Sequence, residues 1–162
     1  MSIDGLSIVA GLGAVGVLAH ATLTASPRFA VGFAIIAVGL AFPAESLVVR
    51  TGRLVHGSHP QVRSVAVAAL AGWISLTYPS FRVAEWILGA SGTTLGTGLL
   101  AGLIATTFDG LVDPIGVRRG WWVYPPAPLS RPRVLGVPWW NSLGWFGLSA
   151  AVVFLAGTLL PH

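Results

Sequence analysis

Residues 91–114 read SGTTLGTGLLAGLIATTFDGLVDP, an apolar run that ends in two aspartates and a proline. A run of about 20 apolar residues has the length that a helix needs to cross the hydrocarbon core of a bilayer. Asp109 and Asp113 are four residues apart, so in a helix they lie on one face, one turn apart. Pro114 then predicts the end of the helix, because it cannot continue the hydrogen-bond ladder and disfavours helical geometry at the preceding residue.

Four further apolar runs predict additional membrane spans. The chain has 162 residues, of which 54% are hydrophobic and only 9% charged, with a mean hydropathy of +0.81. This composition excludes an ordinary soluble globular domain. The first run has no basic segment before it, so we expect it to be retained as a span. We therefore predict an all-α integral membrane protein, a single bundle over residues 1–162 with spans at 5–25, 29–49, 64–86, 91–113 and 142–160.

Arginine is the only strongly basic residue type in the chain, and its distribution predicts a topology. If the spans alternate in direction, the N-terminus and the loops 50–63 and 114–141 share one side of the membrane. That side holds seven arginines, namely Arg50, Arg53, Arg63, Arg118, Arg119, Arg131 and Arg133. The positive-inside rule then places the N-terminus in the cytoplasm and the C-terminus outside a bacterial or archaeal cell membrane. The arginines flank spans without a recognition motif, so nucleic acid is not an expected partner.

Several function classes lack their sequence signals. The chain has no cysteine, which excludes disulfides and thiolate ligands. His56 and His59 lie three residues apart without a matched carboxylate, so we expect no metal site. P-loop, dinucleotide-binding and HExxH motifs are absent, so no cofactor is expected. His20 in the first span is expected to be structural, and Arg82 with Glu85 to form an interfacial ion pair.

The remaining acidic residues predict a functional cluster. Glu45 lies about one turn before the cytoplasmic end of the second span, at the depth of Asp109 and Asp113. A charged side chain in hydrocarbon costs roughly 2.5–3.5 kcal/mol on insertion scales, so such residues are functional candidates. Crowded carboxyl groups resist simultaneous ionisation, so we expect one to stay protonated as a general acid beside a partner base. The alternative is a set of interfacial ion pairs with the arginines that follow each span.

The 114–141 connection is long for a small bundle and rich in Trp and Pro, which predicts a lid or a re-entrant segment. Tryptophan prefers headgroup depth, so some rings are expected to anchor the protein, and others to roof a pocket where aromatic faces stabilise a cation. Asn141 is expected either to bond a carboxyl or to cap the fifth helix. The predicted substrate-binding residues are Trp73, Tyr78, Trp121, Trp122, Tyr124, Trp140, Asn141 and Trp145.

Three blocks of sequence resemble a known family. They are FPAESLVVRTG at 42–52, TFDGLVDP at 107–114 with Gly-Trp-Trp at 120–122, and GVPWWNSLGW at 136–145. In this order, and over about half the chain, they are similar to membrane carotenoid-biosynthesis proteins of the bisanhydrobacterioruberin-hydratase type. The resemblance implies protonation of a terminal isoprenoid double bond, followed by capture of water.

The chain also departs from that family. It is shorter than the family members, and Gly57-Ser-His-Pro-Gln61 stands where they continue with aromatic residues. Small bacterial membrane terpene cyclases use the same opening step, but an internal double bond captures the cation. We therefore expect a membrane terpene cyclase for a hydrophobic polyprenyl or terpenoid substrate, with Glu45, Asp109 and Asp113 as catalytic residues. A carotenoid hydratase is the alternative, and a non-enzymatic membrane subunit or proton-coupled transporter is a third. Five spans enclose little volume, which leaves a homodimer open.

Overall fold

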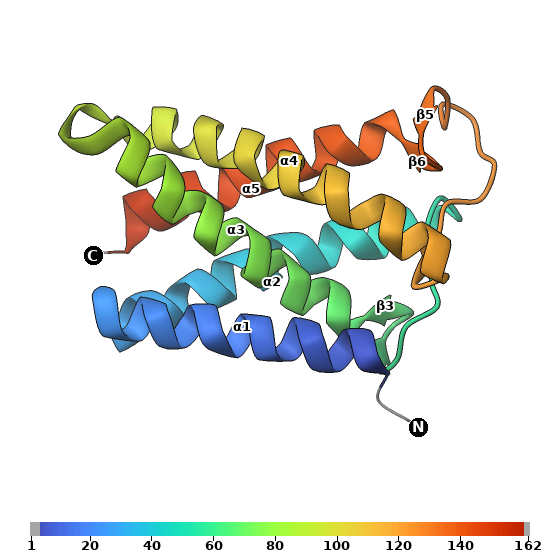
Figure 1. Cartoon of the computed structure of the whole chain (residues 1–162), viewed down its shortest axis with the longest axis horizontal. Coiled ribbons are helices and arrows are strands. Elements are labelled where there is room, and N and C mark those ends of the chain that lie inside the picture. Colours follow the sequence, from blue (N-terminus) through green and yellow to red (C-terminus); the bar gives the residue numbers. More distant parts are fainter. Residues whose placement is uncertain (1–3, 161–162) are drawn as a thin grey trace.

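A computed structural model describes residues 4–160, which form a mostly helical bundle (Figure 1). Its long helices are α1 (Gly5–Thr24), α2 (Pro27–Arg50), α3 (Val67–Leu88), α4 (Thr94–Arg119) and α5 (Trp139–Leu159), and a 3-10 turn, η1 (Gly89–Ser91), follows α3. Each long helix overlaps one predicted span, which confirms a helical fold. By length and composition α1, α2, α4 and α5 could cross a membrane.

Helix α3 does not reach the same apolarity over a membrane-spanning length, and its position explains why. It packs against each of the other four long helices and runs between α1 and α4 (Figure 1). A helix that is surrounded by protein can carry hydroxyl groups, provided that they find partners. Thr77 bonds Ser149 of α5 at 3.2 Å, and the hydroxyl of Ser80 donates to the carbonyl of Leu76 at 2.7 Å.

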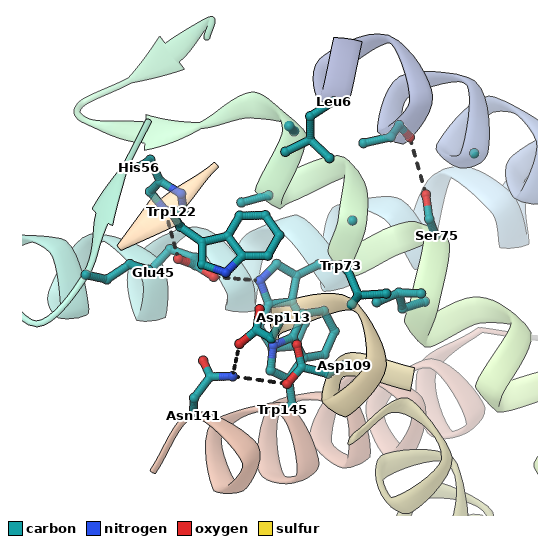
Figure 2. Close-up of a pocket in the computed structure, with 18 of the residues that line it drawn as sticks. Leu6, Glu45, His56, Trp73, Ser75, Asp109, Asp113, Trp122, Asn141 and Trp145 are labelled. Atoms are coloured by element: carbon teal, nitrogen blue, oxygen red, sulfur yellow. Dashed lines mark hydrogen bonds and ion pairs between the residues drawn. The ribbon is translucent and has the colours of Figure 1, made fainter. Parts of the chain in front are cut away.

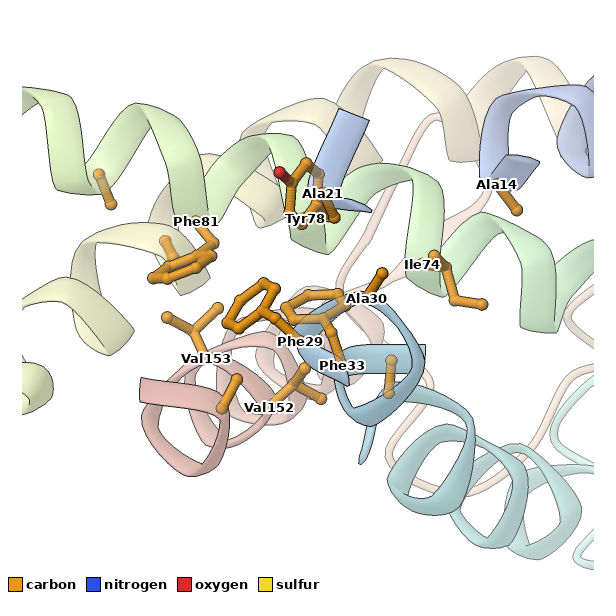
Figure 3. Packing of buried hydrophobic residues seen from close by; sticks show 14 residues of the cluster. Ala14, Ala21, Phe29, Ala30, Phe33, Ile74, Tyr78, Phe81, Val152 and Val153 are labelled. Atoms are coloured by element: carbon orange, nitrogen blue, oxygen red, sulfur yellow. The ribbon is translucent and has the colours of Figure 1, made fainter. Parts of the chain in front are cut away.

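Aromatic packing holds the half of the bundle that lies away from the long connections (Figure 3). Phe29, Phe33 and Phe81 are all buried, and Phe81 stacks on both of the others with ring centroids 6.1 and 6.3 Å apart. Tyr78 meets Phe33 edge-on at 5.5 Å, and its hydroxyl lies 2.9 Å from Nδ1 of His20. His20 therefore has the structural role that its position predicts, and each aromatic pair adds about 0.5–1.5 kcal/mol beyond burial.

The prediction that Pro114 ends its helix is wrong. Helix α4 continues to Arg119, and its C-cap is Gly120, whose φ of 68° is left-handed and whose N–H bonds the carbonyls of Gly116 and Val117. Glycine is the residue that most easily takes this conformation. A proline inside a helix costs about 3 kcal/mol, a penalty that the packing of this buried segment offsets.

The start of α1 and the two long connections lie at the same end of the bundle, which is the arrangement that alternating spans require (Figure 1). Short antiparallel ladders order the connections: β1 (Val55–His56) pairs with β4 (Trp122–Val123), β2 (Gln61–Val62) with β3 (Val65–Ala66), and β5 (Arg133–Val134) with β6 (Val137–Pro138). The first of these ladders joins the connection after α2 to the connection after α4, which lie far apart in the sequence.

Asp4 fastens the start of α1 to the first long connection. Its Oδ1 accepts a hydrogen bond from the backbone N–H of Ser7 at 2.9 Å, and its Oδ2 accepts one from the N–H of His59 at 2.9 Å. Partial burial raises the pKa of Asp4, but these hydrogen bonds outweigh it, so the pKa lies below its ordinary value of 3.8. The charged form of Asp4 therefore stabilises the folded state.

The lowered pKa predicts a pH-dependent contribution to stability. A carboxyl whose folded-state pKa is depressed stabilises the fold above its unfolded pKa, and this contribution is lost as the pH falls through the folded pKa. We expect Asp4→Asn, which keeps a cap but removes the charge, to lower the thermal midpoint at neutral pH. The difference from wild type should shrink as the pH falls below 3.8 and vanish once the pH has passed the lowered folded-state pKa. A difference that stays constant across pH, measured in detergent micelles, would contradict the role of the charge.

Close contact between α4 and α5 depends on glycine. A Cβ atom at Gly102 would lie 2.6 Å from the carbonyl oxygen of Phe146, and one at Gly98 would lie 2.9 Å from that of Ala150. We expect Gly102→Ala to force the helices apart and to cost about 1–3 kcal/mol of unfolding free energy. Gly110→Ala, on the same helix with open space around it, is the matched control and should be neutral or stabilising. Equal losses in thermal unfolding would refute this account.

Candidate active site

A cavity of about 300 Å³ lies near the end of the bundle that carries the long connections (Figure 2). All five long helices and both long connections contribute to its walls. Val9 of α1 lines the cavity and is 68% exposed, so the cavity opens at the apolar outer surface. A second space of about 100 Å³ adjoins it and shares the walls formed by Glu45, Trp73, Asn141 and Trp145.

Two buried aspartates on α4 form the polar centre of the cavity. Asp109 is 1% exposed and Asp113 is 5% exposed. Nδ2 of Asn141, in the first turn of α5, donates to Oδ2 of Asp109 at 3.0 Å and to Oδ2 of Asp113 at 2.6 Å. The hydroxyl of Tyr124 lies 2.7 Å from the same oxygen of Asp113 and 3.0 Å from Oδ1 of Asn141. One amide and one phenol therefore hold the carboxyl pair.

Asn141 takes the first of its two predicted roles. It bonds both carboxyl groups, as expected for a residue that orients an acid. The alternative role as a helix cap is wrong, because α5 begins at Trp139 and its N-cap is Pro138, which offers no side-chain hydrogen bond. Asn141 is thus free to point from the first turn of α5 toward α4 (Figure 2).

The closeness of the two carboxyl groups favours a shared proton. Oδ2 of Asp109 and Oδ2 of Asp113 both accept from Nδ2 of Asn141, and both side chains are buried, so two negative charges here would repel each other and the pair is expected to keep one proton. Asp113 already accepts from Asn141 and Tyr124, and such bonds favour the charged form. Asp109 is therefore the member that carries the proton. Burial, reinforced by the charge of Asp113, raises the pKa of the Tyr124 hydroxyl, so the phenol stays a donor.

The predicted alternative, an ion pair with a nearby arginine, does not occur at these carboxyl groups. In the part of the chain that the structure describes, no arginine lies within ion-pair distance of Asp109, Asp113 or Glu45. The ion pair predicted at the far end of α3 is present, with Nη1 of Arg82 2.6 Å from Oε2 of Glu85. A buried acid without a cationic partner keeps its proton most easily.

Glu45 lines the same cavity as the aspartate pair, as predicted, but it has partners of its own. Nε1 of Trp73 donates to Oε1 of Glu45 at 3.0 Å, and Nε2 of His56 lies 3.2 Å from Oε2. Sequence reasoning considered His56 only as a metal ligand and missed this contact. The position of His56 depends on the pairing of β1 with β4, which sets His56 opposite Trp122. No local sequence pattern predicts this pairing.

Indole rings form much of the remaining wall. Trp73 of α3 and Trp145 of α5 stack with ring centroids 3.7 Å apart and planes at 14°. Trp122 lies directly over Gly116, where a Cβ atom would overlap its ring. Trp140 lines the smaller space and meets Tyr124 edge-on at 5.7 Å. Aromatic faces of this kind stabilise cations.

Two of the predicted substrate-binding residues lie elsewhere. Tyr78 belongs to the aromatic core described above, and its hydroxyl bonds His20 in the C-terminal half of α1. Trp121 does not line either space, and its ring lies under the guanidinium of Arg119 at 5.8 Å. The tryptophans thus divide into rings that wall the cavity and rings that do not.

Side chains from the long connections hold the site residues in place. Nη1 of Arg133 donates to the carbonyl of Tyr124 at 2.7 Å, which fixes the phenol beside the aspartates. Nε2 of Gln61 donates to the carbonyls of His56 and Ser58 at 2.8 and 2.9 Å. Tyr124 and His56, which lie in the connections, are therefore each held through their backbone carbonyls.

The fold and site together define a helical bundle whose cavity joins a protonated carboxyl pair to aromatic walls. No family model, curated protein or solved structure matches this chain. Chemically, the arrangement can deliver a proton into an apolar space and stabilise the positive charge that follows.

Asn141 should contribute to stability through the aspartates. Asn141→Leu keeps the volume of the side chain but leaves both carboxyl groups without its donor. We expect it to lower the unfolding free energy by about 1–3 kcal/mol, the usual cost of an unsatisfied buried polar group. Ser142→Ala, at a neighbouring position that does not line the cavity, is the control. Similar denaturation curves for the two variants in micelles would show that the amide is dispensable.

Proposed function

We propose that this chain is an integral membrane terpene cyclase, which protonates a terminal C=C bond of a prenyl or terpenoid chain and directs ring closure. The observation that carries the proposal is the Asp109–Asp113 pair, held by Asn141 and Tyr124 in an apolar cavity with indole walls. An alkene is a weak base, so its protonation needs an acid that is kept neutral and away from water. The pair meets both needs.

The proposal places all five helices across the membrane. Helix α3 has 22 residues and is therefore about 33 Å long, enough to span the hydrocarbon core. Its contacts with the other four helices shield its hydroxyl groups from lipid. The seven arginines at the end with the long connections favour a cytoplasmic position for that end. The carboxyl pair then lies near the cytoplasmic interface.

The first step transfers one proton. The electron pair of the terminal double bond takes the proton of Asp109, so a C–H bond forms and the O–H bond breaks. Asn141 stays bonded to the carboxylate that results, while the positive charge remains on the neighbouring carbon. The stacked rings of Trp73 and Trp145 can stabilise that charge by about 2 kcal/mol or more in a desolvated site. An internal double bond then attacks the cation and closes the ring.

The size of the cavity supports a substrate that enters by its end. At roughly 30 Å³ for each water-sized group, about 300 Å³ holds on the order of ten non-hydrogen atoms. That is enough for the reacting terminus of a polyprenyl chain and not for a whole carotenoid. The opening beside Val9 leaves the rest of the chain in lipid.

Carotenoid hydration is the second candidate, since Glu45 and His56 give one wall polar groups that could hold a water molecule. A proton-relay transporter has less support. A relay would need polar side chains through the outer half of the bundle, and there Phe29, Phe33 and Phe81 pack together.

Removal of the acid tests the proposal. We expect purified protein in liposomes to convert geranylgeraniol or lycopene. Asp109→Asn should lower the rate of this conversion by about 10²–10⁴-fold. Glu85→Gln, which alters a carboxyl outside the cavity, should retain activity. Mass spectrometry separates the outcomes, because ring closure leaves the mass unchanged and hydration adds one water. Equal rates for Asp109→Asn and wild type, or no conversion of either compound by wild type, would reject the proposal.

A further inference from the structure

His56 has an unusual environment for a residue in a connecting segment. Its side chain is 3% exposed, it lines the cavity, and its Nε2 lies 3.2 Å from Oε2 of Glu45. To bond a carboxylate, Nε2 must carry the ring proton, so Nδ1 of the neutral ring holds a lone pair. That Nδ1 is buried and has no hydrogen-bond partner in the described part of the chain. A buried acceptor left unpartnered is costly and calls for an explanation.

The couple of Glu45 and His56 is also held rigidly. Nε1 of Trp73 occupies the second oxygen of Glu45 at 3.0 Å, and the ring of Trp73 stacks on Trp145. His56 is fixed from its backbone by the β1–β4 pairing and by Gln61. The Glu45–His56 couple is thus hydrogen-bonded to Trp73, one of the two stacked indole rings that would face a cation.

The acid and the couple occupy different walls of one cavity. Asp109 and Asp113 come from α4, whereas Glu45 comes from α2 and His56 from β1 (Figure 2). In the described structure neither Glu45 nor His56 is hydrogen-bonded to Asp109 or Asp113. Instead, Glu45 and His56 are hydrogen-bonded to each other. A reaction that receives a proton at one wall therefore has an acceptor at another.

We infer that His56, supported by Glu45, is the base that accepts the proton lost at the end of the reaction; this inference rests on the proposed function. In that step a C–H bond beside the final cation breaks, its electron pair forms the C=C bond of the product, and the proton goes to Nδ1 of His56. The imidazolium stays bonded through Nε2 to the carboxylate of Glu45, which neutralises it. One proton enters the substrate from Asp109 and one leaves to His56, so ring closure consumes none.

A purely structural role must be separated from this one. The His56–Glu45 bond could serve only to clamp β1 onto α2. His56→Gln distinguishes the two roles, because the amide N–H₂ group can still donate to Glu45 while the basic nitrogen is gone. His59→Gln, an exposed position three residues along that does not line the cavity, is the matched control.

The experiment follows deuterium from D₂O in liposomes that contain the protein and geranylgeraniol or lycopene, whichever the wild type converts. Wild type should form product that carries one deuterium. With His56→Gln we expect product formation to fall by about 10²-fold or more. The substrate should still be protonated by Asp109, and the stranded cation should lose the hydrogen on the carbon that received deuterium back to the Asp109 carboxylate, which restores the original double bond, so recovered substrate should contain deuterium. Asp109→Asn should give neither labelled product nor labelled substrate.

The outcomes separate the inference from the proposed function. If wild type forms labelled product and His56→Gln matches it in rate and product, the inference is wrong while the proposed function stands. Loss of label from both product and substrate in a folded His56→Gln variant also overturns it, because His56 would then act before protonation. If wild type incorporates no label, the proposed function itself fails. If His56→Gln does not fold, Glu45→Gln tests the same couple from α2. We then expect the same loss of product, with labelled substrate still recovered.

Discussion

The two N–H bonds of a single amide organise the half of this bundle that carries the long connections. Nδ2 of Asn141 has two protons and serves two carboxyl groups, one turn apart on the facing helix. This arrangement fixes the rotation of α4 relative to α5, since only one pair of helix faces brings the three side chains together. It also fixes the connection between the helices, because Tyr124 must reach the same carboxyl oxygen. Glycines on α4 make the approach possible, as larger residues would meet the backbone of α5.

The two halves of the bundle are held together by different kinds of contact, apolar in one and polar in the other. The half away from the long connections is packed mainly with phenylalanine rings and small apolar residues, and its buried Thr77 and Tyr78 are paired with Ser149 and His20. The other half carries buried acids, a buried imidazole and indole N–H groups, and so it depends on specific hydrogen bonds. Polar groups in a low-dielectric interior are costly unless each finds a partner. Apolar packing thus dominates one half, and specific polar contacts dominate the half that contains the cavity.

Sequence reasoning located the helices and part of the site, and its failures have physical causes. Apolar runs determine helices in lipid-like surroundings, and a spacing of four residues determines a shared helix face, so Asp109 and Asp113 could be paired from sequence alone. The end of α4 was misplaced, because a local rule about Pro114 ignored the packing around it and the stronger stop signal at Gly120. His56 was missed since its position depends on a pairing between two distant connections.

The location of the site suits a reaction between a lipid-soluble molecule and aqueous protons. On the proposed function the substrate arrives through the opening beside Val9, at the apolar surface, so its chain never has to leave lipid. Protons must come from water, and the acids and His56 line a cavity whose walls include residues of both long connections. A site at mid-membrane would need a relay of polar groups to reload its acid. On the proposed topology a site near the cytoplasmic interface needs no such relay, so the other half of the bundle can be packed mainly with aromatic and small apolar residues.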